Sequence, residues 1–172
     1  MLGYFVAEGQ GAADALLRSV ADAARARGIP LAGAVQVNRE RGPERKCDMD
    51  LHILSGGDVV RISQNLGTLS RGCRLDPAGL ERAVGLVGPA LDQGARLLIV
   101  NKFGKQELDG RGFCPVIGEA LAAGIPVLTA VNAGNLAGFL AWAGDMGERL
   151  PAASDALTDW AERQAAMVPA GG

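Results

Sequence analysis

The segment that most constrains the fold is Leu97-Leu98-Ile99-Val100, an uninterrupted apolar run between Arg96 and Asn101. A strand with one face in water alternates apolar and polar residues, whereas a strand covered on both faces is apolar throughout. The run therefore predicts a central parallel strand with helices packed on both of its faces. That arrangement is the core of a three-layer α/β fold.

The beginning of the chain has the pattern of a strand, a helix and a second strand. Leu2–Ala7 and Ala32–Val37 are apolar runs typical of strands, and Glu8–Gly11 has the composition of a turn. Between the two runs, Leu16 and Val20 recur at helical spacing. Such a βαβ unit joins parallel strands. With 172 residues in total, we expect a single α/β domain over residues 1–172.

A β-hairpin and a loop are expected as an insertion at about residues 39–75. Asp48–Leu54 and Val59–Ser63 have the composition of strands, and the residues between them, Ser55-Gly56-Gly57-Asp58, are typical of a hairpin turn. Residues 64–74 then form a long polar loop, which is uncommon in a compact domain unless it is functional.

Helices and strands alternate again after this insertion. Asp76-Pro77 predicts a helix start, with Asp as the N-cap and Pro as the first helical residue. A further helix precedes the expected strand Pro126–Val131, and two more are expected over Leu136–Ala143 and Ser154–Ala166, the last with its first residue as the N-cap. The predicted fold class is therefore α/β, with three layers, a mostly parallel sheet and an inserted β-hairpin.

Charge and composition argue against several classes of partner. Seventeen Lys and Arg against nineteen Asp and Glu give 17 − 19 = −2, so no basic field is available to hold nucleic acid. Phe139, Trp142 and Trp160 have the spacing of core residues rather than of a base-stacking surface. No apolar stretch approaches the ~20 residues of a membrane span, and the N-terminus has no export signal. With three widely spaced cysteines, these features predict a cytoplasmic protein.

An anion site is expected at the carboxyl ends of the strands, where ligands bind in open parallel sheets. The candidate anion- or nucleotide-binding residues are Gly9, Gln10, Gly11, Asn101, Lys102 and Lys105. The first three lead into a helix, whose N-terminal N–H groups attract anions, although a tight glycine turn explains the same residues. The other three follow the central strand. A solvated loop, with Lys105 paired to Glu107 or Asp109, is the alternative for the lysines.

The residues that hydrolyse nucleoside triphosphates are missing from these positions. A phosphate-binding loop reads G-x-x-x-x-G-K-S/T, but Ala12-Ala13-Asp14-Ala15 stand where the lysine and the hydroxyl are needed, and Asp14 would repel a phosphate. The central strand ends in Asn101 and Lys102, where such an enzyme presents carboxylates for Mg²⁺ and for the attacking water. The pattern favours binding without hydrolysis, and we assign no catalytic residue.

Several short segments carry a family resemblance that extends from Gly3 to about Leu150. They are Cys47–Met49, Ile62–Gln64, Arg71–Pro77, Leu98–Glu107, Gly110–Phe113 and Gly124–Thr129. In these segments the chain resembles a bacterial family of unknown function that is similar to the small P-loop nucleoside-triphosphatases, whose strand-end motif is D-E-I-G-K-M-E-L. Members of that family are often encoded beside molybdate uptake genes.

The resemblance implies a degenerate P-loop NTPase-like fold. Asn101 and Lys102 stand where the triphosphatases have their acidic pair, whereas Gly104, Lys105 and Glu107 match the motif directly. It further implies a role in molybdenum handling, with a molybdate-like oxyanion or a nucleotide as the ligand.

A second cluster combines cysteines and arginines. Its members are Cys47, Arg71, Cys73 and Arg74. The arginines would lower the pKa of the Cys73 thiol or would themselves bind an oxyanion, whereas cysteines packed beneath a loop are the alternative. Cys47, His52 and the distant Cys73 lack the close spacing of a structural zinc site, so the metal stays unassigned.

Three functions remain open on the sequence. The first is a non-hydrolytic protein that holds a small oxyanion or a nucleotide in a degenerate P-loop NTPase site. The second is an active nucleoside-triphosphatase or phosphotransferase, which requires Glu8, Asp14 or Asp48 as its carboxylate. The third is a regulatory module with a vestigial pocket that contacts a protein partner through residues 64–74. Our prediction is the first.

Overall fold

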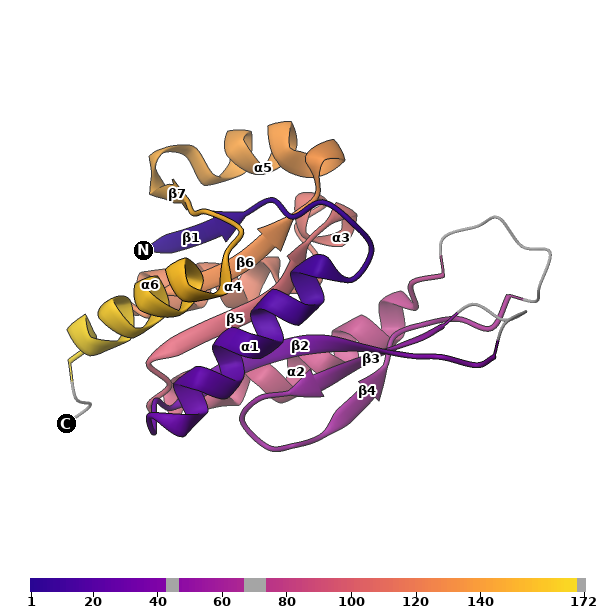
Figure 1. The fold of residues 1–172 in the computed structure, drawn as a ribbon, viewed down its shortest axis with the longest axis horizontal. Helices are drawn as coiled ribbons and strands as arrows, with labels where there is room; N and C mark the ends of the chain where they lie inside the picture. The colour runs from indigo at the N-terminus through magenta and orange to yellow at the C-terminus, as the bar shows by residue number, and fades with distance from the viewer. Residues whose placement is uncertain (43–46, 67–73, 170–172) are drawn as a thin grey trace.

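The structure is a computed structural model and describes residues 1–42, 47–66 and 74–169. At its centre lies a seven-stranded sheet in the order β4-β3-β2-β5-β6-β1-β7 (Figure 1). The strands are β1 (Leu2–Phe5), β2 (Leu31–Arg39), β3 (Asp48–Ile53), β4 (Val59–Arg61), β5 (Leu97–Phe103), β6 (Val127–Val131) and β7 (Gly147–Arg149).

The sheet is mostly parallel, as predicted. Strand β5 pairs in parallel with β2 and β6, and β1 pairs in parallel with β6 and β7. The hairpin of β3 and β4 is also confirmed, and it extends the main sheet because β3 pairs antiparallel with β2. Strand β7, a short edge strand, was not expected from the sequence.

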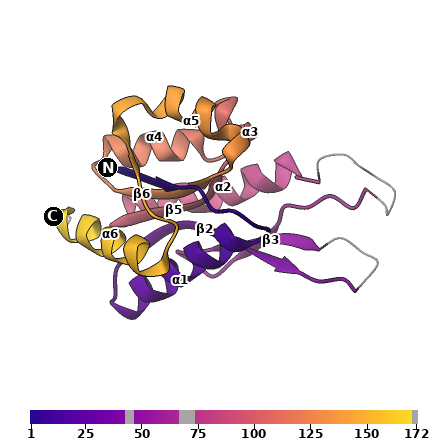
Figure 2. The same ribbon diagram turned by 45° about the horizontal axis from the view of Figure 1, so that its top comes forward.

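Helices cover both faces of the sheet and complete the three predicted layers (Figure 2). Helices α1 (Ala12–Ala26) and α6 (Ser154–Met167) pack on one face; α2 (Pro77–Asp92), α4 (Cys114–Ala122) and α5 (Leu136–Ala143) pack on the other. Three short pieces remain: α3 (Lys105–Leu108), η1 (Ala133–Asn135) and η2 (Gly144–Met146). Within the described ranges, no helix combines the length and apolarity needed to cross a bilayer.

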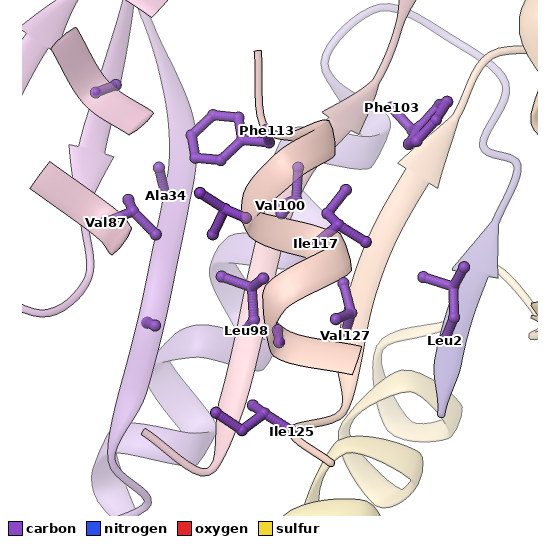
Figure 3. Close-up of a cluster of buried hydrophobic side chains, with 14 of the residues drawn as sticks. Leu2, Ala34, Val87, Leu98, Val100, Phe103, Phe113, Ile117, Ile125 and Val127 are labelled. Carbon is purple, nitrogen blue, oxygen red and sulfur yellow. The ribbon is translucent and has the colours of Figure 1, made fainter. Parts of the chain in front are cut away.

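The apolar run of β5 is buried on both faces. Leu97 and Ile99 belong to the cluster under α1 and α6, whereas Leu98 and Val100 belong to the cluster under α2 and α4, and all four are 0% exposed. In Figure 3, Ile117 of α4 lies over the side chains that β5 and β6 present on this face. Burial on both faces explains why this strand has no polar residue until its carboxyl end.

The two predicted helix caps had different outcomes. Helix α2 begins at Pro77, and the Asp76 carboxylate accepts a hydrogen bond of 3.0 Å from the Ala78 N–H, as expected. The N-cap of α6 is Ala153, so the prediction of Ser154 in this role is wrong. Ser154 is already helical, and its hydroxyl is hydrogen-bonded to that of Ser19 on α1 at 2.8 Å.

The aromatic residues lie in the interior, as predicted. Phe139 and Trp160 are almost completely buried, and Trp142 is partly buried against the core. The ring centroid of Phe103 lies 5.0 Å from that of Phe139 and 4.7 Å from that of Trp142. Contacts at these distances are typical of aromatic packing.

Candidate functional site

The candidate site lies where neighbouring strands connect to helices on opposite faces of the sheet. Strand β1 leads to α1 on one face, and its neighbour β6 leads to α5 on the other. Such a divergence opens a crevice at the carboxyl ends of the strands. A cavity of about 550 Å³ occupies this position, and we call it the polar cavity. Gly9, Gln10, Gly11, Asn132 and Lys102 are among the residues that line it.

The N-terminus of α1 opens into the polar cavity. Gly11 is the N-cap with φ 75°, a conformation that favours glycine, and it has no side chain to cap the helix. Its carbonyl accepts the Ala15 N–H at 3.1 Å. Over the described part of the chain, no protein acceptor meets the N–H groups of Ala13 and Asp14. These N–H groups and the helix dipole favour an anion at this position.

Asn101 is buried and positions its neighbours. Its Oδ1 accepts the Gln36 backbone N–H at 2.7 Å, and its Nδ2 donates to Asp14 Oδ1 at 2.8 Å. Asn38 Nδ2 donates to the other carboxylate oxygen of Asp14 at 3.2 Å. Asn101 therefore ties β5 to β2 and α1. Both oxygens of Asp14, which lines the polar cavity, accept an amide N–H.

A bulge in β5 determines where Lys102 points. Val100 pairs with Thr129 of β6, but the next pair joins Phe103 to Val131, so β5 has one more residue than β6 in this interval. Regular alternation would place Phe103 on the face of Ile99, yet Phe103 packs in the opposite cluster. The extra residue therefore lies at Asn101-Lys102, and a bulge of this kind changes the direction in which a side chain points. Lys102 is the residue that this change of direction affects. Its side chain is exposed and lines the polar cavity.

A second cavity, of about 390 Å³, adjoins the first, and we call it the apolar cavity. Gln36, Met49, Arg74, Lys102 and Asn132 line both cavities. The two cavities therefore meet at a junction that carries two cationic side chains. Among the other predicted site residues, Lys105 and Asn101 line the apolar cavity only.

Glu107, the first acidic residue after β5, is buried beside the apolar cavity. Its Oε2 accepts the Gly104 N–H at 2.9 Å, and its Oε1 accepts the Phe113 N–H at 3.1 Å. Burial raises the pKa of the Glu107 carboxyl above its ordinary value, and the charge of Glu81 raises it further, although both backbone hydrogen bonds act in the opposite direction. The carboxyl holds the α3 turn against the start of α4.

This raised pKa predicts a pH dependence of stability. The folded state holds the Glu107 proton more tightly than the unfolded chain, in which the pKa of a glutamate is about 4.3. The contribution of Glu107 to the free energy of unfolding is therefore highest below that pH and falls as the pH rises through the folded pKa. We expect the stability of the wild type, relative to Glu107→Gln, to decrease over this range in urea unfolding. Glu119→Gln, on the exposed side of α4, is the matched control, and a relative stability that increased with pH would contradict the assignment.

Two of the three carboxylates considered for the enzyme hypothesis, those of Glu8 and Asp48, lie outside the crevice. Asp48 and Asp50 are buried on β3, where Asp48 forms ion pairs with Arg41 and Arg61, the latter at 2.9 Å. The hydrogen bond with Asp50 and the charges of both aspartates raise the pKa of Arg61. Glu8 is exposed and lines neither cavity. Of the three candidates Glu8, Asp14 and Asp48, only Asp14 faces the crevice.

The cysteine and arginine cluster is described only in part, because Arg71 and Cys73 lie outside the described residues. Arg74 Nη1 donates to the backbone carbonyl of Cys47 at 2.7 Å, so these two residues meet through the main chain. Cys114 lies elsewhere, and burial raises the pKa of its thiol. Across residues 1–42, 47–66 and 74–169, no group of three or more His, Cys, Asp or Glu is placed to hold a metal ion.

Sequence reasoning overlooked part of the crevice. Gln36 and Asn38 alternate at the end of β2 and contribute to both the hydrogen-bond network and the cavity walls. A polar residue at every second position near the carboxyl end of a predicted strand was the available signal. Glu107 was recognised as a match to the triphosphatase motif and as a partner for a lysine, but sequence does not reveal that its carboxyl is buried.

Comparison with known proteins gives two similarities. The family described as "Protein of unknown function (DUF2478)" matches residues 2–160. The chain is also 35% identical over 147 residues to the "Molybdenum import ATP-binding protein ModC 2" of Bradyrhizobium diazoefficiens. That alignment covers 86% of this chain but only 16% of the relative, so the chain corresponds to a small part of a much longer protein. No solved structure matches the chain.

Proposed function

The chain belongs to the family described as "Protein of unknown function (DUF2478)", and we propose that it binds a small oxyanion or the phosphate of a nucleotide in the polar cavity without hydrolysing it. The observation that carries this proposal is the convergence of the uncapped α1 N-terminus with Lys102 and Arg74 on one cavity. Backbone N–H groups and flexible cations together are a common means of holding a phosphate group.

The charge around the polar cavity is compatible with an anion. Its described charged lining residues are Lys102, Arg74 and Asp14, which give 2 − 1 = +1. The Asp14 carboxylate would repel an anion, but both of its oxygens already accept amide N–H bonds from Asn101 and Asn38. The cations and the helix N–H groups therefore dominate the contacts left for a ligand.

Hydrolysis is not part of the proposal because the usual groups for it are replaced. Ala12 and Ala13 begin α1 where a phosphate loop has its lysine and hydroxyl. Asn101 cannot act as a general base, and both ends of its amide are occupied. The expected result with ATP and Mg²⁺ is phosphate release no faster than in a protein-free blank.

Molybdenum handling is the most specific form of the proposal. Its support is the similarity to a protein named for molybdenum import and ATP binding, of which this chain covers a small part. Molybdate and phosphate are both tetrahedral oxyanions, so the same N–H groups and cations would contact either one. Molybdate, tungstate, phosphate and ATP are therefore the first ligands to compare by isothermal titration calorimetry.

We expect Lys102→Ala to weaken the binding of molybdate or phosphate about tenfold, since a hydrogen bond to a charged group contributes roughly 1.5 kcal/mol. Lys105→Ala is the matched control, because this lysine is also exposed but lines only the apolar cavity. It should change the dissociation constant of these inorganic ions by less than about twofold. The measurement is calorimetric titration of each variant with each ion.

Two results would contradict the proposal. One is the absence of binding for every anion tested, and the other is an equal loss of affinity in both lysine variants. Phosphate release that exceeds the blank and disappears in Asp14→Asn would instead favour the enzyme hypothesis.

A further inference from the structure

We propose that the ligand is an organic phosphate with a planar apolar ring, whose phosphate occupies the polar cavity and whose ring occupies the apolar cavity. This inference rests on the proposed function and narrows the class of ligand. The observation behind it is that two cavities of opposite character share one cationic junction.

The walls of the apolar cavity are hydrophobic and held by the core. They come from β3, the segment after β4, α2 and the start of α4, and the side chains are Met49, Leu51, Ile62, Leu75, Leu80 and Phe113. Leu51, Ile62, Leu80 and Phe113 each expose 6% or less of their surface, and the other two pack against the same core cluster. The cavity is thus bounded by side chains that the fold itself holds in place.

A bare oxyanion has no surface that these walls would favour. Such an ion would gain its contacts from the N–H groups and cations of the polar cavity and leave the apolar walls in contact with water. An apolar ring removes its own surface and that of the walls from water, which is favourable in proportion to the area buried. At about 390 Å³, the apolar cavity lies within the usual size range of small-molecule sites.

The junction limits how the two parts of the ligand are connected. Lys102 and Arg74 line both cavities, so a phosphate held by them lies at the entrance to the apolar one. A ring attached directly to that phosphate would reach the apolar walls. Gln106 and Asn135 line the apolar cavity alone, and no described residue is hydrogen-bonded to their side-chain amides, which could therefore contact polar substituents on the ring.

The test compares three probes on the full chain: inorganic phosphate, methyl phosphate and phenyl phosphate. We expect phenyl phosphate to bind at least about tenfold more tightly than methyl phosphate, because only its ring buries apolar area. Calorimetric titration gives the dissociation constants. Lys102→Ala should weaken the binding of all three probes.

Filling the apolar cavity separates its contribution from that of the polar one. Leu75→Trp should abolish the preference for the phenyl ester and leave the affinity for inorganic phosphate within about twofold. Leu86→Trp, on the exposed side of α2 and outside both cavities, is the control and should retain the preference. If Leu75→Trp does not fold, Gln106→Trp, on the surface of α3, fills the same cavity.

The outcomes distinguish this inference from the proposed function. Lys102-dependent binding of phosphate with equal affinity for the methyl and phenyl esters would overturn the inference and leave the anion site in place. A phenyl preference that persists in a folded cavity-filling variant would also overturn the inference. If none of the three probes binds, the inference is overturned, and the proposed function is also wrong if molybdate, tungstate and ATP do not bind either.

Discussion

Gly33→Ala is expected to lower the free energy of unfolding by at least about 3 kcal/mol. Gly33 lies in β2 opposite Ile99 of β5, with φ 116°, a conformation that disfavours any side chain. A Cβ added there would overlap the Ile99 carbonyl oxygen and would lie 2.7 Å from its carbonyl carbon. Both atoms are backbone in the centre of the sheet, so relief requires β2 and β5 to separate. Urea unfolding with an unchanged m-value would measure the loss.

Gly118→Ala is the matched control for this effect. Gly118 lies in α4, where an added Cβ meets nothing within 4 Å, and its φ is not positive. Alanine is favoured over glycine inside a helix by roughly 1 kcal/mol, so this variant should be as stable as the wild type or more so. A loss below about 1 kcal/mol for Gly33→Ala would show that the two strands tolerate separation.

Trp160→Ala is expected to destabilise the protein by about 3–5 kcal/mol, the usual range when a buried tryptophan is truncated. Trp160 of α6 is 1% exposed, and its ring lies against Gly3 of β1, where a Cβ would approach it to 2.8 Å. Its Nε1 donates to the Glu148 carboxylate on β7 at 2.8 Å. The side chain thus holds α6 against two neighbouring strands, and removal would leave a void between the layers.

Two further variants make this prediction specific. Met167→Ala, on the same helix but 66% exposed, should change stability by less than about 0.5 kcal/mol. Trp160→Phe keeps most of the apolar ring but loses the hydrogen bond to Glu148, so its loss should lie between those of the two alanine variants. A small loss for Trp160→Ala would contradict the assignment of this residue to the core.

Local patterns in the sequence predicted most of the architecture because burial and helix caps leave direct marks on composition. The run Leu97–Val100 indicated a strand covered on both faces, and β5 is such a strand. Asp76-Pro77 indicated a helix start with a side-chain cap, and α2 has that start. In both cases the cause lies within a few residues of the pattern.

Elements that depend on distant partners were not predictable in this way. Strand β7 has only three residues, Gly147–Arg149, and exists because β1 offers it a parallel edge. Helix α3 is a single turn held by the buried Glu107 carboxyl. Ser154 has the chemistry of a cap, but its hydroxyl is hydrogen-bonded to α1 instead. Each of these features is determined by tertiary contacts.

The candidate site was predictable to a similar extent. The rule that ligands bind at the carboxyl ends of parallel strands selected the Gly9–Gly11 turn and Lys102, which line the polar cavity. It also selected Asn101 and Lys105, which line only the apolar cavity. The contacts of Asp14 with Asn38 and Asn101 were not predictable, because they depend on how α1 crosses β2 and β5. The separation of Lys105 from the polar cavity likewise follows from the geometry after the bulge.

The bulge in β5 places two neighbouring residues in different roles, since Phe103 packs in the core and Lys102 lines the polar cavity. The position of residue 102 is determined by the number of residues between Val100 and Phe103, and not by its chemical type. A side chain at this position lines the polar cavity, whereas Phe103, at the end of the strand, is buried in the core. A substitution at this exposed position can therefore reverse the sign of the charge presented to a ligand in the polar cavity without changing a core residue.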